Sequence, residues 1–274
     1  MKHIVKAYKN AEFLNSPEAR TIRILAEYLE PESRFRKYNI RDTIVFFGSA
    51  RMVPHDSARQ HLQRIKQKIK TLSGRPGPLA AELRQAEINL KTSKYYDDAV
   101  RLAYLITRWS KEIVNNKRKK NRRFIVCSGG GPGIMEAANR GAAEADGYSI
   151  GLNISLPFEQ EPNPYVPREL MFEFHYFFIR KFWFAYLAKA LIIFPGGFGT
   201  VDEMMELLTL LQTRKMTRPL PIIIYGTEYW KKIINFETMV EWGMINPEDL
   251  GLLHYANTPE EAFAILKTEL EKLL

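Results

Sequence analysis

The feature that most constrains the fold is a short apolar run that ends in a glycine-rich loop, and it occurs twice. The first is FIVCSGGGPG at 124–133, and the second is LIIFPGGFGT at 191–200. An unbroken run of Val, Ile and Phe is typical of a strand that is buried on both faces of a parallel sheet. Open sheets of this kind bind ligands beyond the carboxyl ends of their strands, where glycine lets the backbone approach a ligand closely.

Similar apolar runs recur along the chain and alternate with helical patterns. The predicted strands are 43–48, 123–129, 149–154, 190–196 and 220–226. The predicted helices are about 95–115, 133–146, 175–189, 200–213, 227–240 and 258–273. This alternation predicts an α/β protein with a Rossmann-like, doubly wound parallel sheet flanked by helices.

Two segments lie outside the alternating pattern. Residues 1–40 read as an N-terminal helical extension, and residues 41–274 read as the Rossmann-like nucleotide-binding domain. That domain carries an insertion at about 55–94, where SGRPGP at 73–78 separates two apolar stripes. The stripes are Leu62, Ile65, Ile69 and Leu72, then Leu83, Ala86 and Leu90. Their helical spacing predicts a hairpin of two helices that packs on the body or on a second subunit.

The net charge of +9 is concentrated in two places. Residues 55–94 contribute +6 and the run KRKKNRR at 117–123 contributes another +6, so the rest of the chain carries −3. No aromatic residues interleave the basic run, which argues against single-stranded nucleic acid as a partner and favours a solvated basic surface. One cysteine, Cys127, allows no intrachain disulfide, and no apolar stretch is long enough to span a membrane. We therefore expect a cytoplasmic protein with no membrane partner.

The glycine loops differ from the common nucleotide-binding motifs. The dinucleotide pattern G-x-G-x-x-G would need glycine at 134 or 202, where the chain has Ile134 and Asp202. Neither loop ends in the G-K-[ST] of a triphosphate-binding loop. A strand, a glycine loop and a helix start still form a good phosphate site, because the first helical N–H groups are free.

Glu203 has two interpretations that the residues alone leave open. Thr200-Val201-Asp202-Glu203 has the T-x-x-E form of a helix capping box, in which Glu203 would reach back to the start of the helix. Alternatively, the Glu203 carboxylate lies beside a phosphate loop and faces the rest of a ligand. Glu206, one turn further along, would lie on a similar face.

Several motifs together resemble the LONELY GUY family, whose members were long labelled lysine decarboxylases. PGGFGTVDE at 195–203 fits the pattern P-G-G-x-G-T-x-x-E, and IRK at 179–181 precedes it. The larger bacterial branch is resembled by FFGSAR at 46–51, GGGPGIMEAANRGA at 129–142 and GLNISLPFEQEPNPY at 151–165. The resemblance implies a Rossmann-like hydrolase that cleaves the N-glycosidic bond of AMP or cytokinin nucleotides. It also implies a homodimer or a larger homo-oligomer, and neither a metal nor another cofactor.

The resemblance also implies roles for individual residues. Arg180 and Glu203 correspond to the catalytic pair, and the phosphate loop comprises Gly196, Gly197, Gly199 and Thr200. Glu159 or Glu161 would hold the amino group of the base. The remaining candidates for substrate binding are Gly48, Ser49, Gly130, Gly131, Gly133, Lys181 and Glu206.

Two other functions are compatible with a chain of this kind. A non-catalytic nucleotide or cofactor carrier would keep the fold and the loops without turnover. A decarboxylase would need a lysine that forms a Schiff base with pyridoxal phosphate, and no sequence feature singles one out. The presence of both Arg180 and Glu203 favours the hydrolase.

Overall fold

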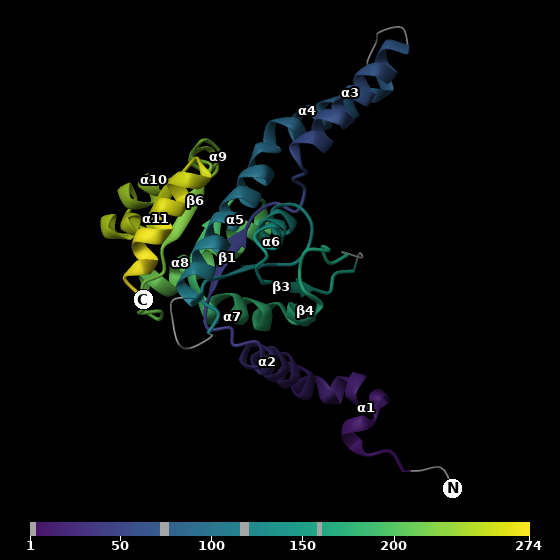
Figure 1. The fold of residues 1–274 in the computed structure, drawn as a ribbon, viewed down its shortest axis with the longest axis vertical. Helices are drawn as coiled ribbons and strands as arrows, with labels where there is room; N and C mark the ends of the chain where they lie inside the picture. Colours follow the sequence, from purple (N-terminus) through teal and green to yellow (C-terminus); the bar gives the residue numbers. More distant parts are fainter. Residues whose placement is uncertain (1–3, 72–76, 116–120, 158–160) are drawn as a thin grey trace.

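The computed structural model describes residues 4–71, 77–115, 121–157 and 161–274. Its centre is a seven-stranded sheet in the order β4-β3-β2-β1-β5-β6-β7, and every strand pair is parallel (Figure 1). The strands are β1 (Thr43–Phe47), β2 (Ile125–Ser128), β3 (Ser149–Ile154), β4 (Met171–Phe174), β5 (Ala188–Ile193), β6 (Ile222–Tyr225) and β7 (Leu253–Ala256). The chain builds outward from β1 in both directions, so the strand order reverses between β1 and β5. This is the topological switch point of a doubly wound sheet.

Helices cover both faces of the sheet, as the alternating pattern predicted. Helices α5 (Lys94–Asn115), α6 (Ile134–Glu144) and α11 (Pro259–Glu271) pack on one face. Helices α7 (Phe177–Leu187) and α8 (Phe198–Gln212) pack on the other. Successive residues of β1 explain how one strand serves two cores, because Ile44 and Phe46 face the first layer while Val45 and Phe47 face the second. The Rossmann-like fold is confirmed.

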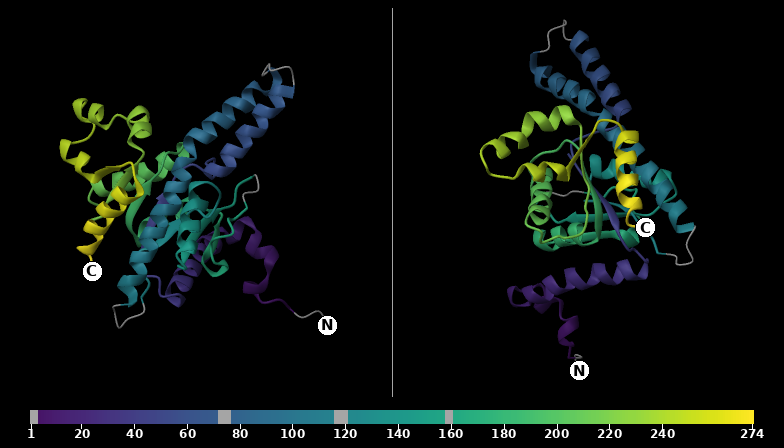
Figure 2. Two further views of the ribbon diagram at one scale, coloured as in Figure 1. Left: turned by 45° about the horizontal axis from the view of Figure 1, so that its top comes forward. Right: turned by 90° about the vertical axis from the view of Figure 1, so that its left-hand side faces the viewer.

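The N-terminal extension is helical and packs beneath α7. It contains a 3-10 turn (Ala7–Lys9), α1 (Ala11–Asn15), a second 3-10 turn (Pro17–Ala19) and the long α2 (Arg20–Lys37), and Figure 2 shows α2 lying along the body. Phe35 anchors α2, with its ring 5.0 Å from that of Phe172 and 5.3 Å from that of Trp183. Glu27 accepts hydrogen bonds from the backbone N–H groups of His175 (2.8 Å) and Tyr176 (3.2 Å), directly before α7 begins.

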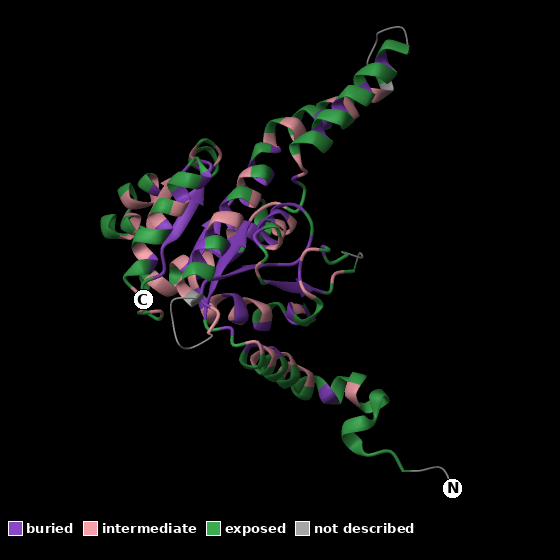
Figure 3. Ribbon diagram, viewed as in Figure 1, coloured by how far each residue is buried: buried purple, intermediate pink, exposed green. Residues whose placement is uncertain are grey.

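The insertion forms a helical hairpin that extends from the body as an arm (Figure 1). It consists of α3 (His55–Thr71), a 3-10 turn (Gly77–Leu79) and α4 (Ala80–Thr92), and α5 begins two residues after α4 ends. The two apolar stripes pack against each other, and Figure 3 shows the buried residues confined to the inner faces of the arm. The stripes are thus already satisfied within the hairpin and give no argument for a second subunit. Leu72 lies outside the described residues.

The structure departs from the predicted elements in a few places. The edge strands β4 and β7 were not predicted, because each has four residues, is only partly buried and includes a polar residue, Glu173 or His254. The predicted helix at 227–240 is two short helices, α9 (Thr227–Ile233) and α10 (Phe236–Glu241). Residues 188–189, predicted to end a helix, instead begin β5. Two further 3-10 turns span Arg168–Leu170 and Pro247–Leu252.

The described part of the basic run is structural. Arg123 forms an ion pair of 2.8 Å with Asp42, and both side chains are buried. The guanidinium of Arg122 lies 4.2 Å from the ring centre of Tyr148. Residues 117–120 are outside the described residues. Over the part of the chain that the structure describes, none of the helices is both long and apolar enough to cross a bilayer.

Candidate active site

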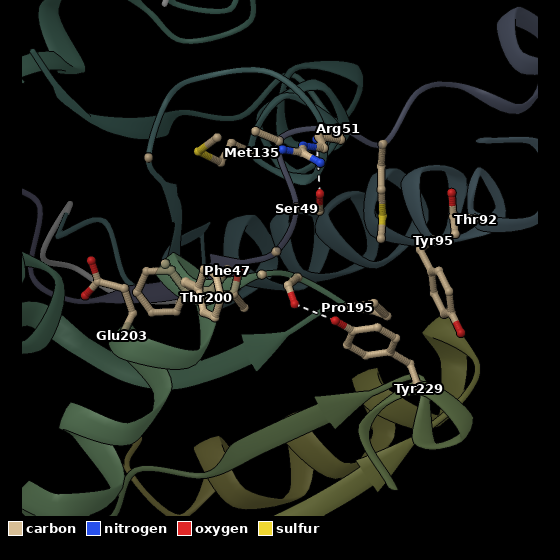
Figure 4. Close-up of a pocket in the computed structure, with 18 of the residues that line it drawn as sticks. Phe47, Ser49, Arg51, Thr92, Tyr95, Met135, Pro195, Thr200, Glu203 and Tyr229 are labelled. Atoms are coloured by element: carbon tan, nitrogen blue, oxygen red, sulfur yellow. Dashed lines mark hydrogen bonds between the residues drawn. The ribbon is translucent and has the colours of Figure 1, made fainter. Parts of the chain in front are cut away.

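A cleft of about 1100 Å³ opens at the carboxyl ends of the strands, at the switch point between β1 and β5. Its walls come from the loop after β1, the glycine loop after β5, the start of α8 and the inner side of α7. The end of α4 and the start of α9 close the opposite side. Figure 4 shows this arrangement, with Glu203 at one end of the cleft and Tyr95 and Tyr229 at the other.

In the glycine loop at 195–200, packing requires glycine at one position and leaves room for a side chain at two others. A Cβ on Gly196 would lie 2.1 Å from Thr200 Oγ1, so this position must be glycine while Thr200 is in place. A Cβ on Gly197 or Gly199 would meet nothing within 4 Å. These two glycines therefore leave open space in the cleft that the protein itself does not fill. The first N–H groups of α8 lack partners within the helix, which makes this space suited to a phosphate.

Glu203 does not form a capping box. Helix α8 begins at Phe198, its N-cap is Gly197, and no side chain caps it. Because the helix begins two residues earlier than predicted, Thr200 lies inside its first turn and Glu203 lies in the second. The structural interpretation of T-x-x-E is therefore wrong, and the Glu203 side chain is instead buried at the edge of the cleft, with 8% exposure.

Arg180 and Glu203 meet across the cleft wall. Nη2 of Arg180 lies 3.3 Å from Oε1 of Glu203, and 15% of the arginine side chain is exposed. Burial raises the pKa of Glu203 to about 7, although the charges of Arg180 and Lys181 act in the opposite direction. Burial also lowers the pKa of Arg180, against the effect of Glu203. Nε of Arg180 is buried without a partner among the described residues, so the guanidinium keeps unused hydrogen-bonding capacity.

Lys181 and Glu206 serve a different purpose from Arg180. Nζ of Lys181 lies 2.8 Å from Asp202 and 2.9 Å from Glu206, which joins α7 to the first turns of α8. Neither Lys181 nor Glu206 is among the residues that line the cleft. Lys181 directly follows Arg180 and Asp202 directly precedes Glu203 in the sequence, so these ion pairs help to hold the two helices together beside the Arg180–Glu203 pair.

The glycine loop after β2 supports the cleft from behind. Of its glycines only Gly129 lines the cleft, whereas Gly130, Gly131 and Gly133 do not. The Asn163 amide donates to the carbonyl oxygens of Gly130 (3.0 Å) and Gly131 (3.1 Å). Gly133 has a φ of +70°, and a Cβ there would lie 2.3 Å from the carbonyl oxygen of Ser49. This close contact holds the loop after β1 in place.

Some of the other predicted site residues line the cleft and others do not. Gly48 and Ser49 line the cleft, as do Gly196, Gly197, Gly199 and Thr200. Glu159 lies outside the described residues. Glu161 is exposed and does not line the cleft. His175 contributes its backbone N–H to Glu27. Three or more His, Cys, Asp or Glu side chains do not converge on a metal-sized site anywhere in the described ranges.

Sequence reasoning missed several residues of the cleft. Arg51 lines it from the loop after β1, and the hydroxyl of Tyr229 on α9 donates to the carbonyl oxygen of Gly196 (2.6 Å). The end of α4 also lines the cleft, although this helix belongs to the insertion. Only FFGSAR, which contains Arg51, held a signal for any of them.

The strand order and the residues that line the cleft define a Rossmann-like α/β protein with a cleft at its switch point. In comparisons with known families, a family model described as "Possible lysine decarboxylase" matches residues 135–266, slightly under half of the chain. The chain is 34% identical over 116 residues to the pyrimidine/purine nucleotide 5'-monophosphate nucleosidase of Escherichia coli K12. That match covers 38% of this chain and 25% of the relative, so the chain spans about a quarter of the relative's length.

A plant relative is matched over more of its length. The probable cytokinin riboside 5'-monophosphate phosphoribohydrolase LOG6 of Arabidopsis thaliana is 27% identical over 181 residues, which cover 65% of this chain and 83% of the relative. Among solved structures, the Moco carrier protein of Chlamydomonas reinhardtii superposes with a TM-score of 0.47 at 19% identity, covering 85% and 99% of the two chains. The molybdenum cofactor binding protein of Rippkaea orientalis gives 0.47 at 16%, covering 83% and 97%. The fold assignment rests on the strand order rather than on these superpositions.

Proposed function

We propose that this protein hydrolyses the N-glycosidic bond of nucleoside 5'-monophosphates and releases the free base and ribose 5-phosphate. The observation that carries the proposal is the buried carboxylate of Glu203, 3.3 Å from Arg180 and beside an open glycine loop at a helix start. The names of the relatives, a nucleotide 5'-monophosphate nucleosidase and cytokinin riboside 5'-monophosphate phosphoribohydrolases, support it. AMP is the first substrate to test, and cytokinin nucleotides are the second.

The geometry supports a division of labour along the cleft. With the 5'-phosphate at Gly197 and Gly199, the ribose lies towards Glu203. Cleavage of the bond between C1' and the base nitrogen leaves positive charge on the sugar, and the bonding electrons go to the base. An ionised Glu203 stabilises that charge and orients the water that attacks C1'. The hydroxide portion of the water bonds to C1', and its proton is transferred to the departing base. The planar fork of Arg180 binds either the phosphate or the departing base.

A homodimer or larger homo-oligomer is part of the proposal. Large apolar side chains are about half exposed on α2 and α7, namely Leu25, Leu29, Phe178 and Tyr186. The side chain of Phe198, at the start of α8, is 97% exposed beside the cleft. We infer that these side chains contact a second copy of the chain, because large exposed apolar surface marks interaction sites. Light scattering on the purified chain measures the assembly directly, and a monomer at all concentrations would contradict it.

The activity is tested by incubating the purified protein with AMP and with adenosine and measuring adenine by chromatography. We expect AMP to be cleaved at least about 100-fold faster in kcat/KM, because the phosphate site supplies binding energy that adenosine cannot use. Equal rates on both would contradict the proposal. Tight AMP binding in calorimetry without any base release would instead identify a non-catalytic nucleotide carrier. We also propose that the protein acts in the cytoplasm.

A further inference from the structure

The cleft continues past the glycine loop, away from Arg180 and Glu203. Its volume of about 1100 Å³ slightly exceeds the usual range for small-molecule sites, roughly 300–1,000 Å³. A nucleoside monophosphate that extends from the glycine loop towards Glu203 leaves the opposite half empty. Figure 4 shows that half as the space below Arg51 and beside Thr92, Tyr95 and Tyr229.

The inserted hairpin provides one wall of this empty half. Gln85, Ile88, Asn89 and Thr92 of α4 all line the cleft. Their spacing of three and four residues places them on one face of the helix. The arm is therefore joined to the body at the ligand site, and the last two turns of α4 are part of that site.

Four basic side chains from separate elements line this half of the cleft. Lys91 is on α4, Lys94 begins α5, Lys232 is on α9 and Arg51 follows β1, and all four line the cleft. Glu228 is the carboxylate that lines this half, so the five side chains together carry +3. Tyr229 and Lys232 are three residues apart on α9, so the hydrogen bond from Tyr229 to Gly196 holds Lys232 close to the glycine loop.

The single carboxylate does not neutralise the cluster. Nζ of Lys232 lies 2.8 Å from Glu228, and both side chains are more than half exposed. A hydrogen bond from Lys232, and then the charges of Lys232, Lys91 and Lys94, lower the pKa of Glu228. In the described residues no ion pair joins Arg51, Lys91 or Lys94 to a carboxylate. Like charges held together repel each other, and a bound anion would relieve that repulsion.

We propose that this half of the cleft is a second anion subsite, built by the insertion, that binds a phosphate group beyond the substrate's 5'-phosphate. The inference rests on the proposed function for the placement of the nucleotide. Its ligand class is a nucleoside 5'-diphosphate, whose β-phosphate would extend from the glycine loop towards Lys91, Lys94 and Lys232. A separate phosphate bound next to a monophosphate has the same chemistry.

The test compares AMP and ADP binding by calorimetry, on a Glu203→Gln background that prevents turnover. We expect ADP to bind about tenfold more tightly than AMP at low salt, and the difference to shrink as salt screens the lysines. The Lys91→Gln/Lys94→Gln variant should lose the preference for ADP and keep its affinity for AMP. Lys66→Gln/Lys68→Gln removes the same charge from exposed positions of α3 and should keep the preference.

A third titration, of AMP in the presence of inorganic phosphate, separates the two sources of the anion. If free phosphate raises the affinity for AMP in a way that depends on the two lysines, the subsite binds a separate anion. If only ADP binds more tightly, the subsite binds the β-phosphate of a diphosphate. The proposal is overturned if the protein with all four lysines intact binds ADP no more tightly than AMP and phosphate does not change the affinity for AMP. It is also overturned if the two double variants show the same preference for ADP. Base release is measured separately, on the wild-type protein. A lysine-dependent preference for ADP without any base release would contradict the proposed hydrolase activity and would still support the anion subsite.

Discussion

Replacing Glu203 by Gln should remove activity and stabilise the fold at the same time. Burial raises the pKa of the Glu203 carboxyl from its ordinary 4.5 to about 7. The folded protein therefore favours the protonated form, and the stability present below pH 4.5 is lost as pH rises through about 7. At 1.36 kcal/mol per pKa unit, this difference lowers the free energy of unfolding by about 3 kcal/mol above pH 7.

Gln has nearly the shape of the protonated acid and cannot ionise. We expect Glu203→Gln to be about 2–3 kcal/mol more stable than wild type at pH 8 and indistinguishable from it near pH 4.5, since only the ionised acid carries the penalty. Base release from AMP should fall about 100-fold or more, because the charge that faces the developing cation is lost. Urea unfolding at both pH values and adenine release at pH 8 give the three measurements.

A matched variant controls for the loss of one negative charge. Glu260 on α11 is exposed and pairs with Arg101 at 3.1 Å. Glu260→Gln should change stability by less than about 1 kcal/mol at either pH and leave base release intact. A Glu203→Gln protein that stays active, or that is no more stable than wild type at pH 8, would refute the reasoning.

Three further outcomes are expected. Because the ionised form of Glu203 is the active one, kcat/KM should rise with pH through about 7, and a rate that falls over that range would contradict the role. Arg180→Ala should lower base release about 100-fold and move that midpoint to higher pH, since Arg180 holds the pKa of Glu203 down, so an unchanged pH profile would count against the pairing. Gly199→Ala should keep the melting temperature and weaken AMP binding, whereas Gly196→Ala should lower the melting temperature because its methyl group would clash with Thr200; calorimetry and thermal melts distinguish the two, and equal effects would show that the loop is not open to ligand.

The central strands and most helices could be predicted from the sequence because their signals are local. Buried parallel strands such as β1 and β5 consist almost entirely of apolar residues, which no other element of that length does as consistently. The edge strands β4 and β7 are covered on fewer sides, so Glu173 and His254 interrupt their pattern. The start of α8 was misplaced because Gly197 caps it through its backbone, which leaves no side-chain signal.

The candidate site was only partly predictable for a related reason. Arg180 and Glu203 belong to motifs, but their 3.3 Å contact depends on α7 and α8 flanking β5, which the motifs alone do not show. Tyr229 and Lys91 come from elements that are far apart in the sequence and carry no motif. They reach the cleft because the sheet order places α9 beside the glycine loop and because α4 ends at the cleft mouth.

The hydrogen bonds from His175 and Tyr176 to Glu27 also have a consequence for synthesis of the chain. The donors and the acceptor are 148 and 149 residues apart, and the N-terminal partner is made first. At about 5–20 residues per second, roughly 7–30 s pass between the synthesis of Glu27 and that of its partners. During that interval Phe35 and Tyr28 have no aromatic partners from β4 and α7 to pack against. The extension can therefore dock only after β4 and α7 have been synthesised, and its docking completes the hydrogen bonding at the start of the helix that carries Arg180.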